Sequence, residues 1–537
     1  MIRPCRPIRV IMLLLFLVAF LLRTIPLDCQ PLWRDEIDAF RFATAPWSEM
    51  LANLTRPGWN GPLYFLLLRF WVLAVGETGF ALRFSSVVFG VLCVPLIYVL
   101  GCRLLGRPVA WMAALLVATS PYFVWYSQEV KMYTLVPALA LLAIYALRRA
   151  VQGRGVAWWA VLTIATSLAV YMHILAALLI PVEVLLYFVW WRHARRRWRA
   201  AVVSLCSLML PYLPLLSWQA PAAFQSRDTG FYPYTLVEMV RILIGGWALG
   251  IQPQGGPWGV VASILVASIG ILCPAFAAAA RAVGPTRRAS SPCQGVTLEV
   301  IALLVWIVVP VSGVALISIR QPMFTDRYLI WAAPALYLLI GLGVGFVASL
   351  GRPGGGIAIF MLGALLIFNG VNLWSQATTP IKADFRGATA YLLTYGESHR
   401  ELPPAHAIVG ADRPFRVYLP MIVGPTSGID GLLVFQIPHG RHSFEYYARG
   451  QPYHWADGLY TNHRLADGSY LLTAEQVDWH MGDLVAGHDV VWLIATEAAM
   501  WDDRGLVQGW LDAYMHREDE AHFTRVDVYR YVHRSAP

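Results

Sequence analysis

The chain has 537 residues, of which 58% are hydrophobic and only 14% are charged, and its mean hydropathy is +0.56. This composition excludes an ordinary soluble enzyme and indicates a polytopic membrane protein. The formal net charge is +9, but the basic residues cluster between apolar runs as topology signals, so we predict no nucleic-acid partner.

The apolar runs predict about eleven membrane-spanning helices, because a span needs about 20 apolar residues. The runs are 8–25, 82–101, 108–126, 132–148, 156–172, 174–191, 200–218, 256–280, 297–318, 328–349 and 356–374. The first run follows three arginines and has no small-residue cleavage site, so we interpret it as an uncleaved span. Arginine-rich loops mark the cytoplasmic side, including the run "RHARRRWR" at 192–199. This pattern predicts a cytoplasmic N-terminus and an extracytoplasmic C-terminus.

Two further apolar stretches, 62–76 and 236–252, are predicted to lie along the outer face of the membrane. If 62–76 crossed, the basic loop "CRLLGRP" at 102–108 would face outside and every later basic loop would invert. Arg69, in the middle of the first stretch, agrees with an interfacial position.

The composition changes after residue 374, which predicts a second domain. Residues 1–374 form the expected transmembrane catalytic domain, and residues 375–537 form a soluble α/β domain on the outer side. There "HAIVGA", "VVWLIA" and "VDVYRYVH" are typical of strands, and "ADFRGATAYLLTYG" and "LVQGWLDAYMH" of helices. The domain has no glycine-rich phosphate loop after a strand and no HExxH spacing, so we predict no nucleotide or metal motif in it.

Charged and polar residues collect on the predicted outer side, where they would face one aqueous cleft. They come from "LWRDEIDAF" at 32–40, "YSQEVKMY" at 126–133, His173, 217–234 and "IRQPMFTDRYLI" at 319–330. A carboxylate there can act as a general base on a hydroxyl acceptor, and Arg and Lys can hold a phosphate. The pattern predicts displacement at a sugar C1, with a lipid-linked phosphate as leaving group and no nucleotide required.

The blocks "LWRDEIDAF", "SPYFVWYSQEVKMYTL", "DRYLIWAAPALYLLIG" and "KADFRGATAYL", in this order, resemble the GT-C superfamily. The similarity is to its bacterial branch related to protein O-mannosyltransferases and the aminoarabinose transferase of lipid A, and it covers roughly 8–390. The resemblance implies an inverting glycosyltransferase that takes its sugar from a polyprenyl phosphate at the outer face of a bacterial inner membrane. It implies a lipid, glycan or protein acceptor, contact with membrane lipids and no organic cofactor. A divalent cation stays open, because some members of the superfamily need one and others do not.

The resemblance also assigns residues. Asp35 matches the catalytic aspartate of the family, and Arg327 matches the arginine expected on the lipid phosphate. The other expected substrate contacts are Glu36, Tyr64, Gln128, Glu129, Lys131, Tyr133 and Tyr328. No metal ligand is assigned. Relatives read "HPPLYY" where this chain has "NGPLYF", from Asn60, and this departure concerns the acceptor side of the site.

Structural alternatives remain for several of these residues. Asp35 could be the N-cap of the helix that follows it. Glu129 and Lys131 could form only an ion pair with each other, and Arg327 could extend to lipid head groups. His173 is interpreted as a structural residue at a tight turn.

Two other functions compete with transfer of a sugar to an acceptor at the outer face. A polymerase or ligase of lipid-linked polysaccharide would share the donor chemistry and differ in acceptor. A transporter or flippase should carry ionisable residues in mid-span. Here the predicted spans are nearly free of charge apart from Glu183, Glu299 and arginines near their ends, which argues against transport.

Overall fold

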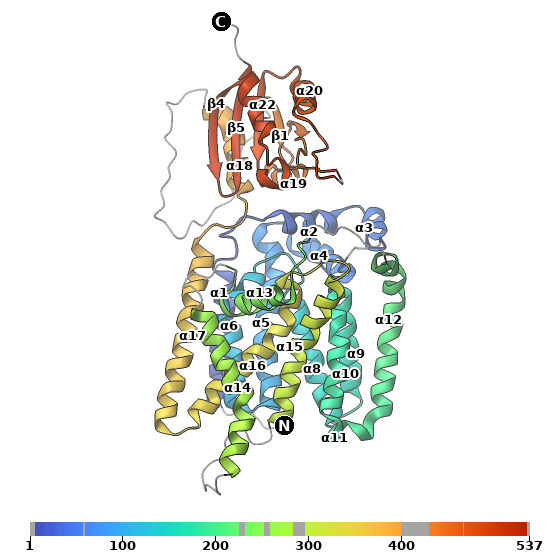
Figure 1. The fold of residues 1–537 in the computed structure, drawn as a ribbon, viewed down its shortest axis with the longest axis vertical. Coiled ribbons are helices and arrows are strands. Elements are labelled where there is room, and N and C mark those ends of the chain that lie inside the picture. The colour runs from blue at the N-terminus through green and yellow to red at the C-terminus, as the bar shows by residue number, and fades with distance from the viewer. Residues whose placement is uncertain are drawn as a thin grey trace. The chain divides into compact units, whose positions relative to one another are not determined.

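The computed structural model describes residues 6–56, 60–224, 231–251, 258–282, 296–398, 429–465 and 467–533. The chain divides into two units (Figure 1). The first comprises Met1–Leu27 and Phe42–Gln376, and the second comprises Asp28–Arg41 and Ala377–Pro537. The short segment Asp28–Arg41 therefore belongs with the C-terminal part of the chain.

Among its described residues, the first unit contains helices and no strands. Its helices are α1 (Arg6–Thr24), α3 (Trp47–Leu54), α4 (Pro62–Val75), α5 (Gly79–Leu104), α6 (Arg107–Thr119), α7 (Pro121–Tyr126), α8 (Leu135–Val151), α9 (Ala157–Met172), η1 (Ile174–Leu178), α10 (Leu179–Val189), α11 (Trp191–Ala194), η2 (Arg195–Arg197), α12 (Trp198–Phe224), α13 (Leu236–Leu249), α14 (Trp258–Ala282), α15 (Thr297–Ser318), η3 (Asp326–Ala332), α16 (Ala333–Ala348) and α17 (Arg352–Thr378). The predicted class, a polytopic helical protein with a C-terminal α/β part, is confirmed.

Four described helices are long and apolar enough to cross a membrane, and a bent helix pair raises the number to five if it forms one span. The four are Gly79–Leu104, Thr297–Ser318, Asp326–Ala348 and Arg352–Thr378, and the pair is Ile174–Val189 with Trp191–Leu208. The predicted spans 82–101, 297–318, 328–349 and 356–374 fall on the four helices. The count of about eleven spans stays a prediction.

One predicted span is interrupted. The run 108–126 forms α6 and α7 instead of one helix, because Ser120 adopts extended backbone angles and is followed by Pro121. The Ser120 hydroxyl accepts a hydrogen bond from the Phe123 amide and so caps α7. The break matters because α7 leads directly into the "SQEVKMY" loop.

The helices α4 and α13 fall on the two stretches predicted to lie along the membrane face. Each has 14 residues, so each is about 21 Å long at about 1.5 Å per residue, whereas the hydrocarbon core is about 30 Å thick. Figure 1 shows α13 running across the direction of the long helices. The position of both helices relative to the membrane stays a prediction.

The helix α16 lies at the centre of the first unit, with almost all of its residues buried. Its contact with α14 depends on two glycines. A Cβ atom on Gly343 would lie 2.0 Å from the Val266 carbonyl oxygen, and one on Gly270 would lie 2.2 Å from the Leu339 carbonyl oxygen. The two helices therefore pack backbone against backbone, as small residues allow in membrane proteins.

The second unit is built on a five-stranded sheet with the order β2-β1-β3-β5-β4. The strands are β1 (Leu432–Phe435), β2 (His454–Asp457), β3 (Val490–Ala495), β4 (Met515–Phe523) and β5 (Val526–His533). β1 pairs in parallel with β2 and β3, whereas β5 pairs antiparallel with β3 and β4. The predicted strands "VVWLIA" and "VDVYRYVH" are β3 and β5, and "HAIVGA" lies outside the described residues.

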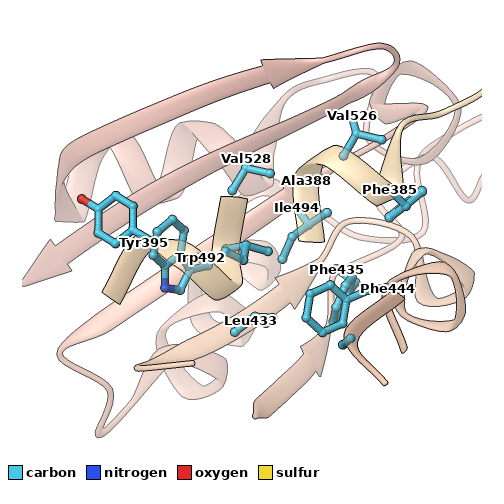
Figure 2. Packing of buried hydrophobic residues seen from close by; sticks show 12 residues of the cluster. Phe385, Ala388, Tyr395, Leu433, Phe435, Phe444, Trp492, Ile494, Val526 and Val528 are labelled. Carbon is cyan, nitrogen blue, oxygen red and sulfur yellow. The ribbon is translucent and has the colours of Figure 1, made fainter. Parts of the chain in front are cut away.

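Helices cover both faces of this sheet, because the strand residues alternate between two apolar clusters. The helices of the unit are α2 (Arg34–Thr44, shared with the first unit), α18 (Phe385–Ser398), α19 (Pro438–Ala448), α20 (Ala474–Val485), α21 (Ala498–Trp501) and α22 (Leu506–Tyr514). Figure 2 shows the cluster under α18 and α19, where the Tyr395 and Trp492 rings meet edge to face with centroids 4.8 Å apart. The predicted helices 383–396 and 506–516 correspond to α18 and α22.

Candidate active site

The sequence-predicted site residues fall into two groups, one in each unit. Tyr64, Gln128, Glu129, Lys131, Tyr133, Arg327 and Tyr328 belong to the first unit, and Asp35 and Glu36 belong to the second. Each group is described by itself below.

In the first unit, the loop that carries Lys131 follows α7 and is hydrogen-bonded to α5. The Ser86 hydroxyl on α5 donates to the carbonyl oxygens of Glu129, at 2.6 Å, and of Lys131, at 3.0 Å. The Thr134 hydroxyl donates back to the Ser86 carbonyl at 2.8 Å. These bonds occupy backbone groups that a membrane environment would otherwise leave unsatisfied. These hydrogen bonds to backbone groups fix the conformation of the loop, and so the position of Lys131.

The buried Arg23, near the end of α1, fixes the start of the same loop. Its Nε donates to the Ser127 hydroxyl at 3.1 Å, and its guanidinium also donates to the carbonyl oxygens of Val117 and Ala118. The Gln128 amide donates in turn to the Arg23 carbonyl at 3.1 Å. A buried arginine is tolerated because hydrogen bonds satisfy its charged group.

The short helix η3 brings the "RY" block to this loop. Asp326, at its start, accepts a hydrogen bond from the Tyr126 hydroxyl at 3.0 Å. The next residue, Arg327, places its guanidinium 5.6 Å from the centroid of the Tyr133 ring, within cation–π range. The Tyr328 ring lies 6.5 Å from the same Tyr133 ring. Two blocks that are far apart in the sequence therefore meet.

His173 lies at the centre of this group, between α9 and η1. Its ring stacks on Tyr328, with centroids 4.5 Å apart, and it is 3% exposed. Burial, together with the positive charges of Arg327 and Lys131, lowers the pKa of His173 to about 3. The imidazole is therefore neutral at physiological pH.

The hydrogen bonds of His173 determine which nitrogen carries its proton. Nδ1 accepts a hydrogen bond from the Leu175 amide at 3.3 Å, so the proton of the neutral ring is on Nε2. Nε2 is buried and has no hydrogen-bond partner among the described residues. The interpretation of His173 as a turn residue describes only Nδ1. The other nitrogen is a donor that sequence reasoning missed.

The departure from the family pattern, Asn60–Gly61, packs against the residues on either side of this histidine. The Asn60 side-chain oxygen accepts a hydrogen bond from the Ile174 amide at 2.7 Å. Gly61 has a φ of +78°, and a Cβ atom there would lie 2.8 Å from the Met172 carbonyl oxygen. The first contact uses the side-chain oxygen of Asn60, and the backbone at Gly61 favours a residue without a Cβ atom. They also bring the start of α4, with the buried Tyr64 on its first turn, to the His173 turn.

In the second unit, Asp35 and Glu36 lie in the first turn of α2, where the helix dipole stabilises negative charge. The helix begins at Arg34, one residue before Asp35, so Asp35 is not its N-cap. Instead, Glu36 reaches back and accepts a hydrogen bond from the Trp33 amide at 3.4 Å. The Glu36 carboxylate also accepts a charge-assisted hydrogen bond from the Lys382 ammonium at 2.8 Å.

Asp35 lies close enough to α19 to influence His439. Burial and the neighbouring Arg34 lower the pKa of His439 to about 4, and the Asp35 carboxylate opposes them. The described residues contain no group of three or more His, Cys, Asp or Glu side chains that could hold a metal ion. The structure therefore assigns no metal ligands.

Residues 57–218 match the family of dolichyl-phosphate-mannose-protein mannosyltransferases. This range includes Asn60–Tyr64, the Lys131 loop and His173. No curated protein sequence matches the chain.

Two solved structures are similar over nearly the whole chain. ArnT from Cupriavidus metallidurans in its apo state aligns with a TM-score of 0.55, 13% identity and 98% coverage of both chains. It has also been solved bound to undecaprenyl phosphate, and that form gives a TM-score of 0.54. The archaeal oligosaccharyltransferase AglB from Archaeoglobus fulgidus, in complex with an inhibitory peptide and a dolichol-phosphate, aligns with a TM-score of 0.55 and 15% identity. That alignment covers 97% of this chain and 74% of AglB. In fold the chain is therefore similar to the membrane glycosyltransferases ArnT and AglB, and residues 57–218 also match the mannosyltransferase family.

Proposed function

We propose that the chain is an inverting glycosyltransferase that moves a sugar from a polyprenyl-phosphate carrier to an acceptor at the outer face of a bacterial inner membrane. Asp35 is the general base. The observation that carries the proposal is the convergence of Lys131, Arg327 and the Nε2–H donor of His173 in the first unit.

These three groups suit a phosphate that leaves with negative charge. Lys131 and Arg327 supply positive charge, and Arg327 can bind two phosphate oxygens at once. His173 supplies a neutral donor, so it adds a hydrogen bond without a third positive charge to repel the other two. Donors fixed in place before the reaction stabilise developing charge most effectively. ArnT and AglB, which share this fold, have been solved with undecaprenyl phosphate and with a dolichol-phosphate.

The reaction needs one base and no nucleotide. Asp35 takes the proton of an acceptor hydroxyl, whose oxygen attacks the sugar C1. The bond between C1 and the phosphate oxygen breaks, and its electron pair leaves with the polyprenyl phosphate. A single displacement inverts the configuration at C1. Tyr64, Gln128, Glu129, Tyr133 and Tyr328 remain proposed substrate contacts.

The proposal also gives the chain an orientation. The N-terminus is cytoplasmic and the C-terminal unit is extracytoplasmic, as the arginine-rich loops predict. Labelling of single cysteines introduced at 77 and 105 tests this orientation. The cysteine at 77 should react from outside and the one at 105 only from the cytoplasm.

The test of activity compares purified wild type with Asp35→Asn on a panel of short-chain polyprenyl-phosphate sugars. Wild type should release free polyprenyl phosphate, and Asp35→Asn should lose this release while it still binds donor. Asp38→Asn is the matched control, because Asp38 lies one turn further along α2 and forms an exposed ion pair with Arg34 at 3.8 Å. Full activity of Asp35→Asn would refute the assignment of the base.

A further inference from the structure

The segment that carries Asp35 is anchored to the start of the C-terminal part of the chain, within the second unit. The Gln30 side chain makes the first anchor. Its amide nitrogen donates to the Thr379 carbonyl at 2.8 Å, and its oxygen accepts from the amides of Ile381 and Lys382 at 3.2 and 3.4 Å. One side chain thus forms hydrogen bonds with three backbone groups of the segment 379–382.

Further anchors lie on either side of Gln30. Arg386 donates to the Asp28 carboxylate at 2.8 Å and to its carbonyl oxygen at 3.2 Å. The Leu32 amide donates to the Tyr447 hydroxyl at 2.6 Å. On α2 itself, the Phe40 ring meets Tyr446 edge to face, with centroids 5.5 Å apart. Contacts therefore run along the segment from Asp28 to Phe40.

The ion pair between Glu36 and Lys382 is the most deeply buried of these contacts. The Glu36 side chain is 0% exposed and that of Lys382 is 5% exposed, with 2.8 Å between the charged atoms. The Lys382 ammonium also lies 5.8 Å from the centroid of the Trp33 ring. Two charges removed from water contribute little net stability. What a buried pair does supply is a fixed geometry, since breaking it leaves a buried charge uncompensated.

This geometry controls the direction of the neighbouring carboxylate. Successive residues of an α-helix are about 100° apart around the axis, so Glu36 and Asp35 project in different directions. Holding Glu36 on Lys382 fixes the rotation of α2 about its axis, and with it the direction of Asp35.

We propose that Glu36 and Lys382 are a positioning pair for Asp35, and that the C-terminal unit serves as the template on which the catalytic loop is built. Glu36 is then a positioning residue and not a substrate contact. This inference rests on the proposed function, because the pair can position a general base only if Asp35 is that base.

The test measures kcat and donor KM for Lys382→Met, which removes the charge and nearly keeps the shape. A misplaced base slows the chemical step and leaves donor binding intact. We expect kcat to fall by about 100-fold, as a displacement of about 1 Å can cause, with an unchanged donor KM. Lys382→Arg, which keeps the charge, should recover most of the rate.

Arg148→Met is the matched control, because Arg148 forms a similarly buried ion pair with Glu299 in the first unit, with side chains 9% and 10% exposed. It should lower the melting temperature in the same way and leave kcat unchanged below that temperature. A folded Lys382→Met protein with wild-type kcat would overturn the inference. An equal loss of kcat in Arg148→Met would do so as well, because the effect would then be general instability.

If Lys382→Met does not fold, Glu36→Gln replaces it, because glutamine keeps the shape and an acceptor oxygen. A fall in kcat at constant donor KM supports positioning, whereas a raised KM at constant kcat shows a substrate contact and overturns it. Wild type and Asp35→Asn are measured in parallel. A fully active Asp35→Asn protein means that the base assignment within the proposed function has failed, whatever the Lys382 variants do.

Discussion

Replacing His173 by asparagine tests whether the neutral histidine is part of the phosphate site. An asparagine side chain can accept a hydrogen bond from the amide two residues further on. His173→Asn therefore keeps a partner for the Leu175 amide, which now donates to Nδ1 at 3.3 Å. It removes the Nε2–H donor, which has no partner among the described residues, together with the ring that stacks on Tyr328. The variant should fold and bind donor weakly.

The expected magnitude follows from the type of bond that is lost. A hydrogen bond to a charged group contributes about 1.5–3 kcal/mol, which corresponds to roughly 10- to 150-fold in Kd. The binding of a short-chain polyprenyl phosphate, measured by calorimetry with wild type and variant, checks this value. His516→Asn, at an exposed position on β4, is the control and should bind as wild type does. A His173→Asn protein with wild-type affinity would refute the role of Nε2.

The same variant gives a pH test with a definite sign. The pKa of His173 is about 3 in the folded chain, against an ordinary value of 6.5. Between these values the unfolded chain binds the proton and the folded chain does not, so folding stability falls as the pH is lowered from 6.5 towards 3. The loss is about 1.4 kcal/mol per pH unit. Melting curves at pH 6.5 and 5.5 should therefore show a smaller loss for His173→Asn than for wild type, and an equal loss would contradict a buried neutral histidine.

Three further predictions concern other parts of the structure. Lys131→Met and Arg327→Met should each weaken donor phosphate binding by about 10-fold or more and reduce its dependence on salt, because each removes a charge-assisted contact; a salt titration of Kd checks this. Gly61→Ala should lower the melting temperature and the activity more than Gly76→Ala, since both have positive φ but a Cβ atom only at Gly61 meets neighbouring atoms. Phe435→Ala should destabilise the C-terminal unit by about 3–5 kcal/mol, because Phe435 is 0% exposed in its core, and the near-ultraviolet melting signal of that unit would report it.

Much of the fold could be predicted from the sequence because composition and apolar run length reflect burial directly. The spans at 82–101 and 297–318 coincide with α5 and α15, and the strands at 490–495 and 526–533 with β3 and β5. The break at Ser120 was missed, since an apolar run does not show where a serine will cap a new helix. The attachment of residues 28–41 to the C-terminal unit was also missed. It depends on side chains such as Gln30 pairing with residues some 350 positions away, and no periodicity in the sequence signals that.

The candidate site also has a part that the sequence could indicate and a part that it could not. An arrangement in which Lys131 and Arg327 both lie near His173 agrees with the sequence-based expectation, because membrane topology sorts charged loops onto one side. The role of His173 could not be predicted, because a histidine at a turn is most simply explained by its turn. The structure shows that one nitrogen serves the turn, and that the ring packs on Tyr328 beside two cations.

The adjacent carboxylates Asp35 and Glu36 show why a motif alone does not assign roles. In the sequence they form one acidic pair, and resemblance places both near the substrate. On α2 they cannot face the same way, because successive side chains are about 100° apart. The buried Lys382 takes the Glu36 carboxylate, so Glu36 is already neutralised inside the unit, whereas Asp35 is only partly buried. A carboxylate held by a buried lysine is a poor proton acceptor, since protonation would leave the lysine unpaired. The two proposals above therefore assign the base to Asp35 and the positioning role to Glu36.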